Sequence, residues 1–427
     1  MKVAFCTLGC RLNFAETSTI SRFFTERGFS IVPFSQKADF YVLNSCSVTA
    51  NANKKGRNAI SRAYSLNPEA TIIVTGCYAQ LKPDEVANLP GVKYVFGTNN
   101  KAEIEKIIDQ TLQEKAQISV TQHNEMKSYF PAFSKGDRTR AFLKVQDGCD
   151  YFCAYCTIPF ARGRSRNQSI ADCVKQVEDL ARENMKEVII SGVNIGDFGK
   201  TTNESFHDLL KAFVKVDGID RFRIGSIEPN LLTDEIIEFV ASEPKIMPHF
   251  HIPLQTGSDE LLKKIGRKYD TALFRHKIEL IKKLIPNAFI GIDLIVGVNG
   301  ETQEMFEQTV DFVSSLDISF IHHFQYSERE NTRALDVVPR TSPKQKAERS
   351  KIITEISNQK HYNFIKSQLG NTYNILFEST KKSGKMFGFT ENYIKVAVDF
   401  DKNLINQIRK AQLIDFIDDG CVSVKFI

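Results

Sequence analysis

The sequence has no apolar run long enough to cross a membrane, which takes about 20 consecutive apolar residues, and no apolar leader precedes its first predicted strand. Complete pairing of its cysteines into disulfides is also excluded, because their number, nine, is odd. We therefore expect a cytoplasmic protein with no membrane partner. Its thiols are expected to be reduced, and so better suited to bind metal than to form disulfides.

A large excess of one charge is also lacking. The 427 residues hold 56 Lys and Arg against 51 Asp and Glu, which gives a net charge of +5 and an isoelectric point near 8.6. This mild basicity permits an RNA partner without requiring one. A hydrophobic content of 42% and a charged content of 25% are typical of globular proteins. The length predicts about three domains.

Three of the cysteines lie within eight residues, in the segment Cys149-Asp150-Tyr151-Phe152-Cys153-Ala154-Tyr155-Cys156. Zinc prefers four ligands in paired groups, but no His or Cys follows at that spacing, and buried structural cysteines seldom lie so close together. Three thiolates at this spacing can hold three corners of a cubane 4Fe–4S cluster and leave its fourth iron open. Tyr155 matches the signature of enzymes that cleave S-adenosylmethionine to a radical, in which this aromatic flanks the adenine of the cofactor.

Cys10, Cys46 and Cys77 are far apart in the sequence, yet each follows an apolar run that predicts a buried parallel strand. Loops after neighbouring parallel strands share one crevice at the carboxyl edge of an open sheet. We therefore predict that these three thiols meet and hold a second cluster. Three separate buried cysteines are the alternative that the pattern leaves open. The remaining cysteines are interpreted as packing residues; they are Cys6, Cys173 and Cys421.

The order of strands and helices predicts an α/β multidomain protein. Residues 1–120 alternate strand and helix, ending in a helix expected at Ala102–Lys115, and predict a parallel α/β sheet domain. Residues 121–137 have the composition of a linker. Residues 138–367 predict a partial (β/α)6 barrel with its site at the C-terminal ends of the strands. Its strands are expected at Ala141–Gln146, Glu187–Ser191, Arg221–Ile227, His249–Leu254, Phe289–Val296 and Ile318–Phe324.

Residues 368–427 change to short alternating strands and predict a small β-barrel. Such barrels often bind RNA, although the fold alone does not establish this.

Polar residues and glycines after successive barrel strands are candidates to bind S-adenosylmethionine, although turns are often rich in such residues for steric reasons. They are Gly192, Asn194, Ser226, Glu228, Gln255 and Asp293, together with Tyr155 and the weaker candidate Arg267. The basic loop Arg162-Gly163-Arg164-Ser165-Arg166 is predicted to contact RNA phosphates or a carboxylate of the cofactor or substrate, with a solvated loop as the alternative. No catalytic residue is predicted beyond the cluster ligands.

These motifs resemble the radical S-adenosylmethionine methylthiotransferases over nearly the full length, and within them the branch that acts on threonylcarbamoyladenosine in transfer RNA. The resemblance rests on both cysteine sets with their flanks, on residues 158–166, and on segments such as Gly192-Val193-Asn194-Ile195-Gly196 and Ser226-Ile227-Glu228-Pro229-Asn230. Two loops depart from the family. Gly297-Val298-Asn299-Gly300-Glu301 replaces Gly-Phe-Pro-Gly-Glu, and Asn331 replaces a Gly. Asn tolerates a left-handed backbone, so this turn is expected to survive.

The resemblance implies an auxiliary 4Fe–4S cluster held by Cys10, Cys46 and Cys77, and a radical 4Fe–4S cluster held by Cys149, Cys153 and Cys156. It implies that one S-adenosylmethionine methylates sulfur attached to the auxiliary cluster, while another is cleaved at the radical cluster. The methylthio group then goes to C2 of an adenine splayed from the anticodon loop. A TRAM-like C-terminal barrel that binds RNA, and a low-potential flavodoxin or ferredoxin as electron donor, are further implications.

Other interpretations stay open. Relatives apply the same chemistry to isopentenyladenosine in transfer RNA or to an aspartate of a ribosomal protein. A non-catalytic iron–sulfur electron carrier or RNA-binding protein is disfavoured, because a carrier does not need an open three-cysteine site.

Overall fold

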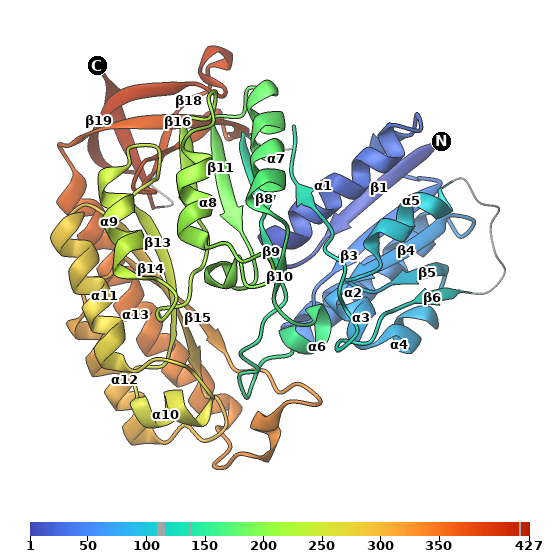
Figure 1. Ribbon diagram of the computed structural model, residues 1–427, viewed down its shortest axis with the longest axis horizontal. Coiled ribbons are helices and arrows are strands. Elements are labelled where there is room, and N and C mark those ends of the chain that lie inside the picture. Colours follow the sequence, from blue (N-terminus) through green and yellow to red (C-terminus); the bar gives the residue numbers. More distant parts are fainter. Residues whose placement is uncertain (109–115, 137–138, 418–419) are drawn as a thin grey trace.

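Three sheet-based units follow one another along the chain in the computed structural model (Figure 1), which describes residues 1–108, 116–136, 139–417 and 420–427. The N-terminal unit has six parallel strands in the order β2-β1-β3-β4-β5-β6. They are β1 (Lys2–Thr7), β2 (Ser30–Val32), β3 (Phe40–Ser45), β4 (Thr71–Gly76), β5 (Val92–Phe96) and β6 (Gln117–Ser119). Every residue of β3 and β4 is buried, which explains why apolar residues follow one another without a break over Phe40–Leu43 and Ile72–Val74.

The helices of this unit are α1 (Arg11–Thr25), α2 (Ala50–Leu66), α3 (Cys77–Leu81), α4 (Pro83–Ala87), the 3-10 turn η1 (Lys101–Glu103) and α5 (Ile104–Ile107). The strand order reverses direction between β1 and β3, because the chain leaves β1 toward β2 and leaves β3 toward β4. Such a switch point opens a crevice at the carboxyl ends of the two strands. Residues 109–115 of the helix expected at Ala102–Lys115 lie outside the described residues.

The central unit contains the six expected parallel strands, arranged as two sheets. They are β8 (Arg140–Lys144), β11 (Glu187–Ser191), β12 (Arg221–Ile224), β13 (His249–Gln255), β14 (Phe289–Val296) and β15 (Phe320–Gln325). Parallel bridges from Phe222 to Ile246 and from Ser226 to His251 join the two sheets into one arc. Within the segment expected to be a linker, β7 (Ala132–Phe133) pairs antiparallel with β8.

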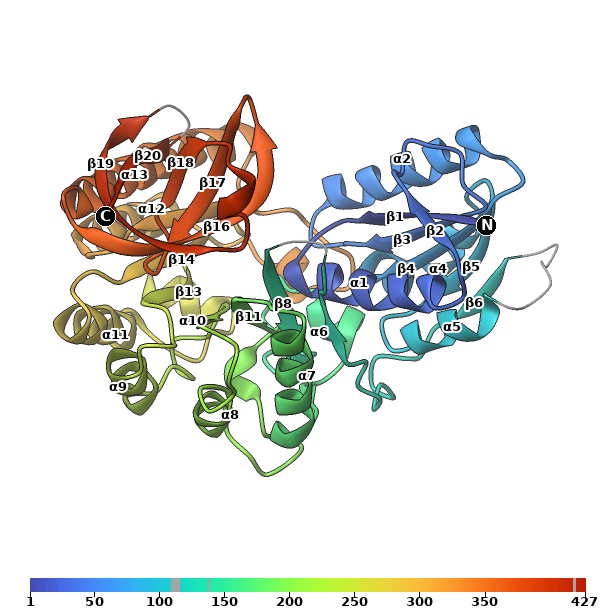
Figure 2. The same ribbon diagram turned by 90° about the horizontal axis from the view of Figure 1, so that it is seen from above.

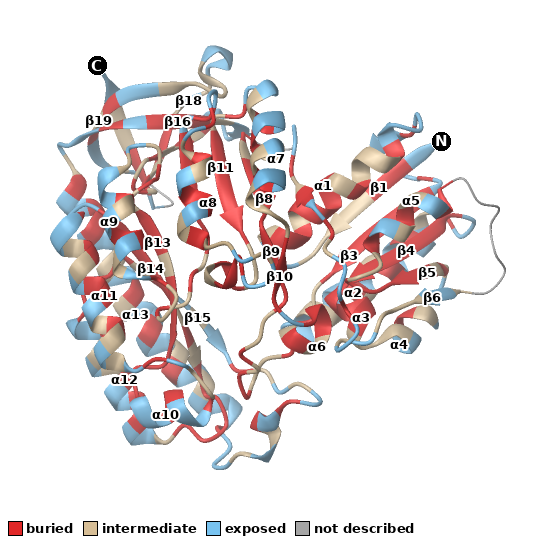
Figure 3. Ribbon diagram, in the orientation of Figure 1, coloured by how far each residue is buried: buried red, intermediate tan, exposed pale blue. Residues whose placement is uncertain are grey.

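Helices cover the outer side of this arc, and Figure 3 shows their buried faces turned to the strands and their exposed faces turned to solvent. The longer ones are α7 (Ile170–Arg182), α8 (Phe206–Phe213), α9 (Asp234–Ser242), α11 (Thr271–Leu284) and α12 (Gln303–Ser315). Shorter elements form the loops at the carboxyl ends of the strands: β9 (Gln146–Asp147), α6 (Ile158–Arg162), β10 (Arg166–Asn167), η2 (Ile195–Asp197), α10 (Asp259–Lys264) and η3 (Arg333–Asp336).

Helix α13 (Pro343–Gln368) leads to a C-terminal sheet whose strands pair in the closed order β16-β17-β18-β20-β19. The elements are β16 (Thr372–Lys382), β17 (Lys385–Thr390), β18 (Lys395–Asp399), η4 (Lys402–Leu404), β19 (Ile408–Ile417) and β20 (Cys421–Phe426). Arg221 donates to the carbonyls of Phe389 and Asn374, and Arg223 donates to the carbonyl of Glu391. Since Arg221 begins β12, this sheet lies at the amino ends of the central strands, opposite the carboxyl-end loops.

Helix α1 joins the N-terminal unit to the central one. Its Phe14 ring meets Phe142 of β8 edge-on, with ring centroids 5.6 Å apart. One hydrophobic cluster contains Val3 and Phe24 from the N-terminal unit together with Phe142 and Ile189 from the central unit. Figure 2 shows α1 lying between β1 and β8. The first turn of α1, and therefore Cys10, is held against the central strands.

Candidate active site

The three N-terminal cysteines lie where the sequence predicts, just beyond the carboxyl ends of neighbouring strands. Cys46 and Cys77 directly follow β3 and β4, and Cys10 precedes the first residue of α1. All three are free thiols. Gly9 has φ +103°, and a Cβ at this position would lie 2.7 Å from Cys46 Cβ, so only glycine lets these two loops approach each other.

Hydrogen bonds hold the loops after β1, β3 and β4 together. Asn13 of α1 donates to the carbonyl of Leu8 at 2.7 Å and to that of Ser45 at 3.0 Å. Ser45 donates from its hydroxyl to the carbonyl of Thr75 at 2.5 Å and accepts from the backbone N–H of Ala79 at 3.3 Å. Carbonyls one or two residues before the three cysteines thus accept hydrogen bonds from side chains of the same unit.

The central cysteines lie in the loop that follows β8 and β9 and leads to α6. Gly148 precedes Cys149 with φ +72°, and a Cβ there would lie 2.0 Å from the carbonyl oxygen of Arg164. The backbone N–H of Tyr151 donates to Cys149 Sγ at 3.5 Å, and that of Ile158 donates to Cys156 Sγ at 3.4 Å. N–H groups directed at cysteine sulfur are one of the means by which proteins tune iron–sulfur sites.

Tyr155, Glu228 and Arg267 come together at this loop. Arg267 donates to Cys153 Sγ at 3.3 Å and to the Tyr155 hydroxyl at 3.5 Å, and it forms an ion pair with Glu228. Burial raises the pKa of Glu228, although Arg267 opposes this. The structure therefore shows Arg267 bridging a carboxylate and a cluster-loop thiol.

Gly192 and Asn194 lie in the loop after β11. The backbone N–H of Asn194 donates to Gln146 Oε1 at 2.8 Å, and its side chain donates to Asp197 at 3.0 Å. Its Oδ1 is buried and, among the described residues, has no hydrogen-bond partner. At Gly192 a Cβ would lie 2.6 Å from Ile195 Cγ2, so the backbone there is closely packed.

The inner face of the arc carries Asp293, which accepts from His251 Nε2 at 2.8 Å, so this carboxylate is already paired. The neighbouring ring of His322 lies 5.2 Å from that of His251, and burial followed by the field of His251 lowers the pKa of His322 to about 4. Neither histidine was predicted to be a site residue, because only the pairing of the strands shows that both side chains lie on the inner face. Ser226 bridges to the strand of His251, and Gln255 has φ +68° at a register shift of β13.

The prediction that the basic loop contacts phosphates is wrong for Arg162 and Arg166, whose side chains are only 1% and 7% exposed. Arg162 donates to Glu16 at 3.1 Å and to Asp147 at 2.9 Å. Only Arg164, at 72% exposure, faces solvent.

Glu16 is the centre of this buried network. It forms ion pairs with Lys101 and, at 2.9 Å, with Lys144, in addition to Arg162. Burial alone would raise the pKa of Glu16, but these three cations hold it well below the usual range. The network thus joins α1, η1, β8 and α6 across the two units.

The residues fit the two clusters that the sequence predicts. Burial raises the pKa of Cys77 to about 11 and those of Cys149 and Cys156 to about 12. Such thiols ionise when a metal supplies the opposing charge. No three described His, Cys, Asp or Glu side chains are placed to hold a single metal ion. This is compatible with a cubane, because each of its thiolates binds a different iron.

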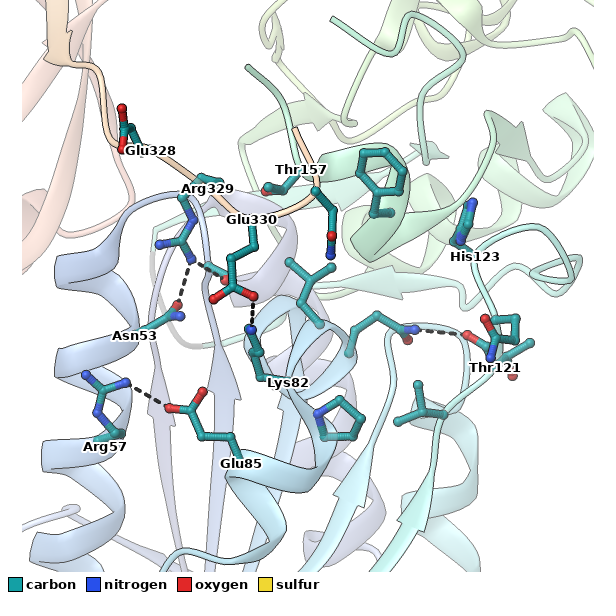
Figure 4. A pocket seen from close by; sticks show the side chains of 18 residues that line it. Asn53, Arg57, Lys82, Glu85, Thr121, His123, Thr157, Glu328, Arg329 and Glu330 are labelled. Atoms are coloured by element: carbon teal, nitrogen blue, oxygen red, sulfur yellow. Dashed lines mark hydrogen bonds and ion pairs between the residues drawn. The ribbon is translucent and has the colours of Figure 1, made fainter. Parts of the chain in front are cut away.

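A cavity of about 690 Å³ lies between the N-terminal unit and the loops of the central one, beside both cysteine sets. Its lining includes Ser47, the neighbour of Cys46, and Thr157, the neighbour of Cys156. Figure 4 shows Arg329 reaching across from the loop after β15, where it donates to Ser47 at 2.8 Å and to Asn53 at 3.3 Å. In the same loop Asn331 has φ +63°, so the expected left-handed turn is present.

Comparisons with known proteins agree with this geometry. Residues 2–97 match the family described as "Uncharacterized protein family UPF0004", and residues 143–313 match the Radical SAM superfamily. The threonylcarbamoyladenosine tRNA methylthiotransferase MtaB of Bacillus subtilis (strain 168) is 37% identical over 424 residues, covering 96% of this chain and 93% of the relative. The protein of that name from Aquifex aeolicus (strain VF5) is 35% identical, with 93% and 96% coverage.

A second kind of relative is less similar. The tRNA-2-methylthio-N(6)-dimethylallyladenosine synthase of Alkaliphilus oremlandii (strain OhILAs) is 31% identical, covering 97% of this chain and 90% of the relative.

Among solved structures, the radical S-adenosylmethionine methyltransferase TsrM from Kitasatospora setae, with cobalamin and a [4Fe-4S] cluster bound, has a TM-score of 0.56 at 15% identity. The match covers 76% of this chain and 74% of that one, and it shows a shared fold. No described helix is long and apolar enough to span a membrane. The identity to the methylthiotransferases extends over nearly all of both chains, so this protein belongs to the family of radical S-adenosylmethionine methylthiotransferases that modify transfer RNA.

Proposed function

We propose that this enzyme transfers a methylthio group to C2 of N6-threonylcarbamoyladenosine, next to the anticodon of transfer RNA. The observation that carries the proposal is the pair of three-cysteine sets at strand ends of adjoining units, joined through α1 and α6. In the overall reaction the C2–H bond is replaced by a C2–S bond. One S-adenosylmethionine gives its methyl group to sulfur, and the other takes up the hydrogen as 5′-deoxyadenosine.

Cys149, Cys153 and Cys156 would hold the cluster that, when bound, supplies the electron for cleaving S-adenosylmethionine. Cys10, Cys46 and Cys77 would hold the auxiliary cluster that carries the sulfur. Arg267 orients the first cluster loop through Cys153, and Tyr155 is fixed beside it. The buried Oδ1 of Asn194, which has no hydrogen-bond partner among the described residues, is an acceptor for a donor group of the cofactor. The proposed wall of the cofactor site also contains Gly192, Ser226 and Gln255. Two carboxylates complete it, namely Glu228, which pairs with Arg267, and Asp293, which pairs with His251.

Arg11 supports the threonylcarbamoyl substrate over isopentenyladenosine, because only the former carries a carboxylate. It directly follows Cys10 and is partly buried. In the described part of the chain it has neither a hydrogen bond nor an ion pair. Burial lowers the pKa of Arg11, and its charged surroundings are Tyr393, Arg140, Arg223 and Glu187. The charged groups around the guanidinium thus belong to the central and C-terminal units, and it has no hydrogen bond or ion pair among the described residues. Such a guanidinium is suited to bind the substrate carboxylate.

The C-terminal sheet is proposed to be a TRAM-like barrel that contacts the anticodon arm. Its turn between β16 and β17 exposes Lys381 and Lys385, which can approach phosphates. A cytoplasmic location and a low-potential flavodoxin or ferredoxin as electron donor belong to the same proposal.

The first test is mass spectrometry of transfer RNA nucleosides from cells with and without the protein. Selective loss of 2-methylthio-threonylcarbamoyladenosine is expected, and an unchanged nucleoside profile would contradict the proposed substrate. Cys153→Ala should abolish 5′-deoxyadenosine and product together. Cys46→Ala should still cleave S-adenosylmethionine but transfer no sulfur, and full methylthiolation by this variant would refute the auxiliary site.

The role of Arg11 is tested by binding of anticodon stem-loops. Arg11→Gln should weaken binding of the loop with threonylcarbamoyladenosine and leave the unmodified loop unaffected. The matched control is Arg57→Gln, because Arg57 already pairs with Glu85 at 3.1 Å. Equal losses for both loops in the Arg11 variant would remove this assignment while leaving the reaction class intact.

A further inference from the structure

Arg162 connects the two cysteine sets through a single buried guanidinium. It is the last residue of α6 and lies six residues after Cys156. Its Nη2 donates to Asn13 Oδ1 at 2.7 Å, and its Nη1 donates to Asp147 Oδ1 at 2.9 Å. Asn13 binds the carbonyl of Ser45 just before Cys46, and Asp147 lies two residues before Cys149. Arg162 is thus two hydrogen bonds from the N-terminal cysteine loops and adjacent to the central one.

The network around Arg162 has more positive than negative charge. Two carboxylates, Glu16 and Asp147, face four cations, each less than a tenth exposed: Lys101, Lys144, Arg162 and Arg166. Uncompensated buried charge is costly, so an opposing charge is expected nearby. Asn13 Oδ1, which accepts from Arg162 Nη2 at 2.7 Å, also accepts from Cys10 Sγ at 3.8 Å. A cubane held by three thiolates is anionic, and in the N-terminal crevice it would supply this missing charge.

Methylthio transfer gives this charge a function. If an iron of the auxiliary cluster carries the methylthio group, its transfer to a carbon radical would break one Fe–S bond, form one C–S bond and leave one electron on the cluster. No outside reductant or oxidant is needed for this step. The cluster core would gain one electron while the methylthiolate ligand gives up its negative charge, so the net charge stays the same and shifts from the ligand toward the core. A fixed cation on the cysteine side of the core favours this shift.

We propose that Arg162 is a positioning residue that, through its charge, raises the reduction potential of the cluster held by Cys10, Cys46 and Cys77. The proposal rests on the proposed function, since it requires a cluster at these cysteines. It assigns a role at the N-terminal site to a residue that follows the central cysteines in the sequence, and it gives the buried cation-rich network a function.

The test measures the N-terminal cluster alone, in full-length protein with Cys149, Cys153 and Cys156 replaced by Ala and then reconstituted with iron and sulfide. Its midpoint potential is followed by electron paramagnetic resonance. Arg162→Gln keeps hydrogen-bond donors but removes the charge. We expect its midpoint to fall by at least about 59 mV, a tenfold change in the ratio of reduced to oxidised cluster for one electron. Arg162→Lys keeps the charge and should stay close to the unsubstituted protein.

The matched control is Arg164→Gln, which removes an exposed cation two residues away and should leave the midpoint unchanged. An unchanged midpoint in Arg162→Gln, or an equal shift in Arg162→Lys, would overturn the proposal. If Arg162→Gln does not take up the cluster, Lys101→Gln removes another fully buried cation of the same network, whose hydrogen bond in the described structure goes to Glu16 and not to Asn13. It must then shift the midpoint downward for the proposal to stand. These potentials are measured without substrate, so the proposal can fail while methylthiolation of transfer RNA stands, and the reverse also holds.

Discussion

Glu16→Gln should destabilise the protein strongly, because this one carboxylate holds three buried cations. The side chain is fully buried and pairs with Lys101, Lys144 and Arg162. After substitution, Asp147 is the only carboxylate left in the network. Arg162 keeps its contact to Asp147, but Lys101 has no other ion pair in the described part of the chain. The substitution therefore leaves a buried lysine charge without a partner.

The expected loss follows from the cost of breaking a buried ion pair, which is about 3–5 kcal/mol. Glutamine still accepts one hydrogen bond, so the lower end, about 3 kcal/mol, is expected. This is a large share of the roughly 5–15 kcal/mol that stabilises a typical domain. Because the network joins α1 to β8 and α6, the loss should affect the contact between the N-terminal and central units first.

The assay is urea denaturation of the cluster-free protein, followed by circular dichroism. The unfolding free energies of the variants are compared where these free energies fall with urea concentration at the same slope. The control is Glu105→Gln, which breaks a pair with Arg27 at 3.3 Å whose side chains are 46% and 28% exposed. An exposed pair of this kind is worth about 0–1 kcal/mol. A loss for Glu16→Gln no larger than that of the control would refute the reasoning.

Two further predictions concern pH and backbone geometry. Burial raises the pKa of Glu187, but Arg223, Arg140 and Arg221 lower it to about 2 from 4.5. Because the folded-state pKa is the lower one, its stabilisation is present above pH 4.5 and is lost as the pH falls toward 2. Glu187→Gln should show a weaker acid dependence of urea midpoints over this range, and identical profiles would contradict this. Gly76→Ala should reduce iron bound by the N-terminal cysteines, because Gly76 has φ +95° and a Cβ would lie 2.4 Å from the Ser45 carbonyl oxygen. Gly384→Ala, at φ +79° but with open space, is the control, and equal iron in both variants would be inconsistent with this account.

Much of the fold could be predicted because its signals are local. The apolar runs Phe40–Leu43 and Ile72–Val74 lie in strands that are fully buried. Once such strands are parallel, their carboxyl ends share an edge, and the cysteines that follow them must lie near one another. The spacing of Cys149, Cys153 and Cys156 is likewise a local property. The turn at Asn331 could also be predicted locally, because asparagine is one of the few residues that readily adopt its left-handed backbone conformation.

Whether a charged side chain is buried or exposed could be learned only from the tertiary structure. Arg162 and Arg164 are two residues apart and chemically identical, yet one is buried and the other is exposed. The difference depends on Glu16, which lies 146 residues away in the sequence and meets Arg162 only after α1 packs on β8.

The sequence by itself thus determined the order of strands and helices and the placement of both cysteine sets, because hydrophobic period and residue spacing act within a few residues. Only the tertiary structure decided which cations face solvent and which are buried beside the cysteines. A buried charge is stable only where distant segments bring its partners within hydrogen-bond distance.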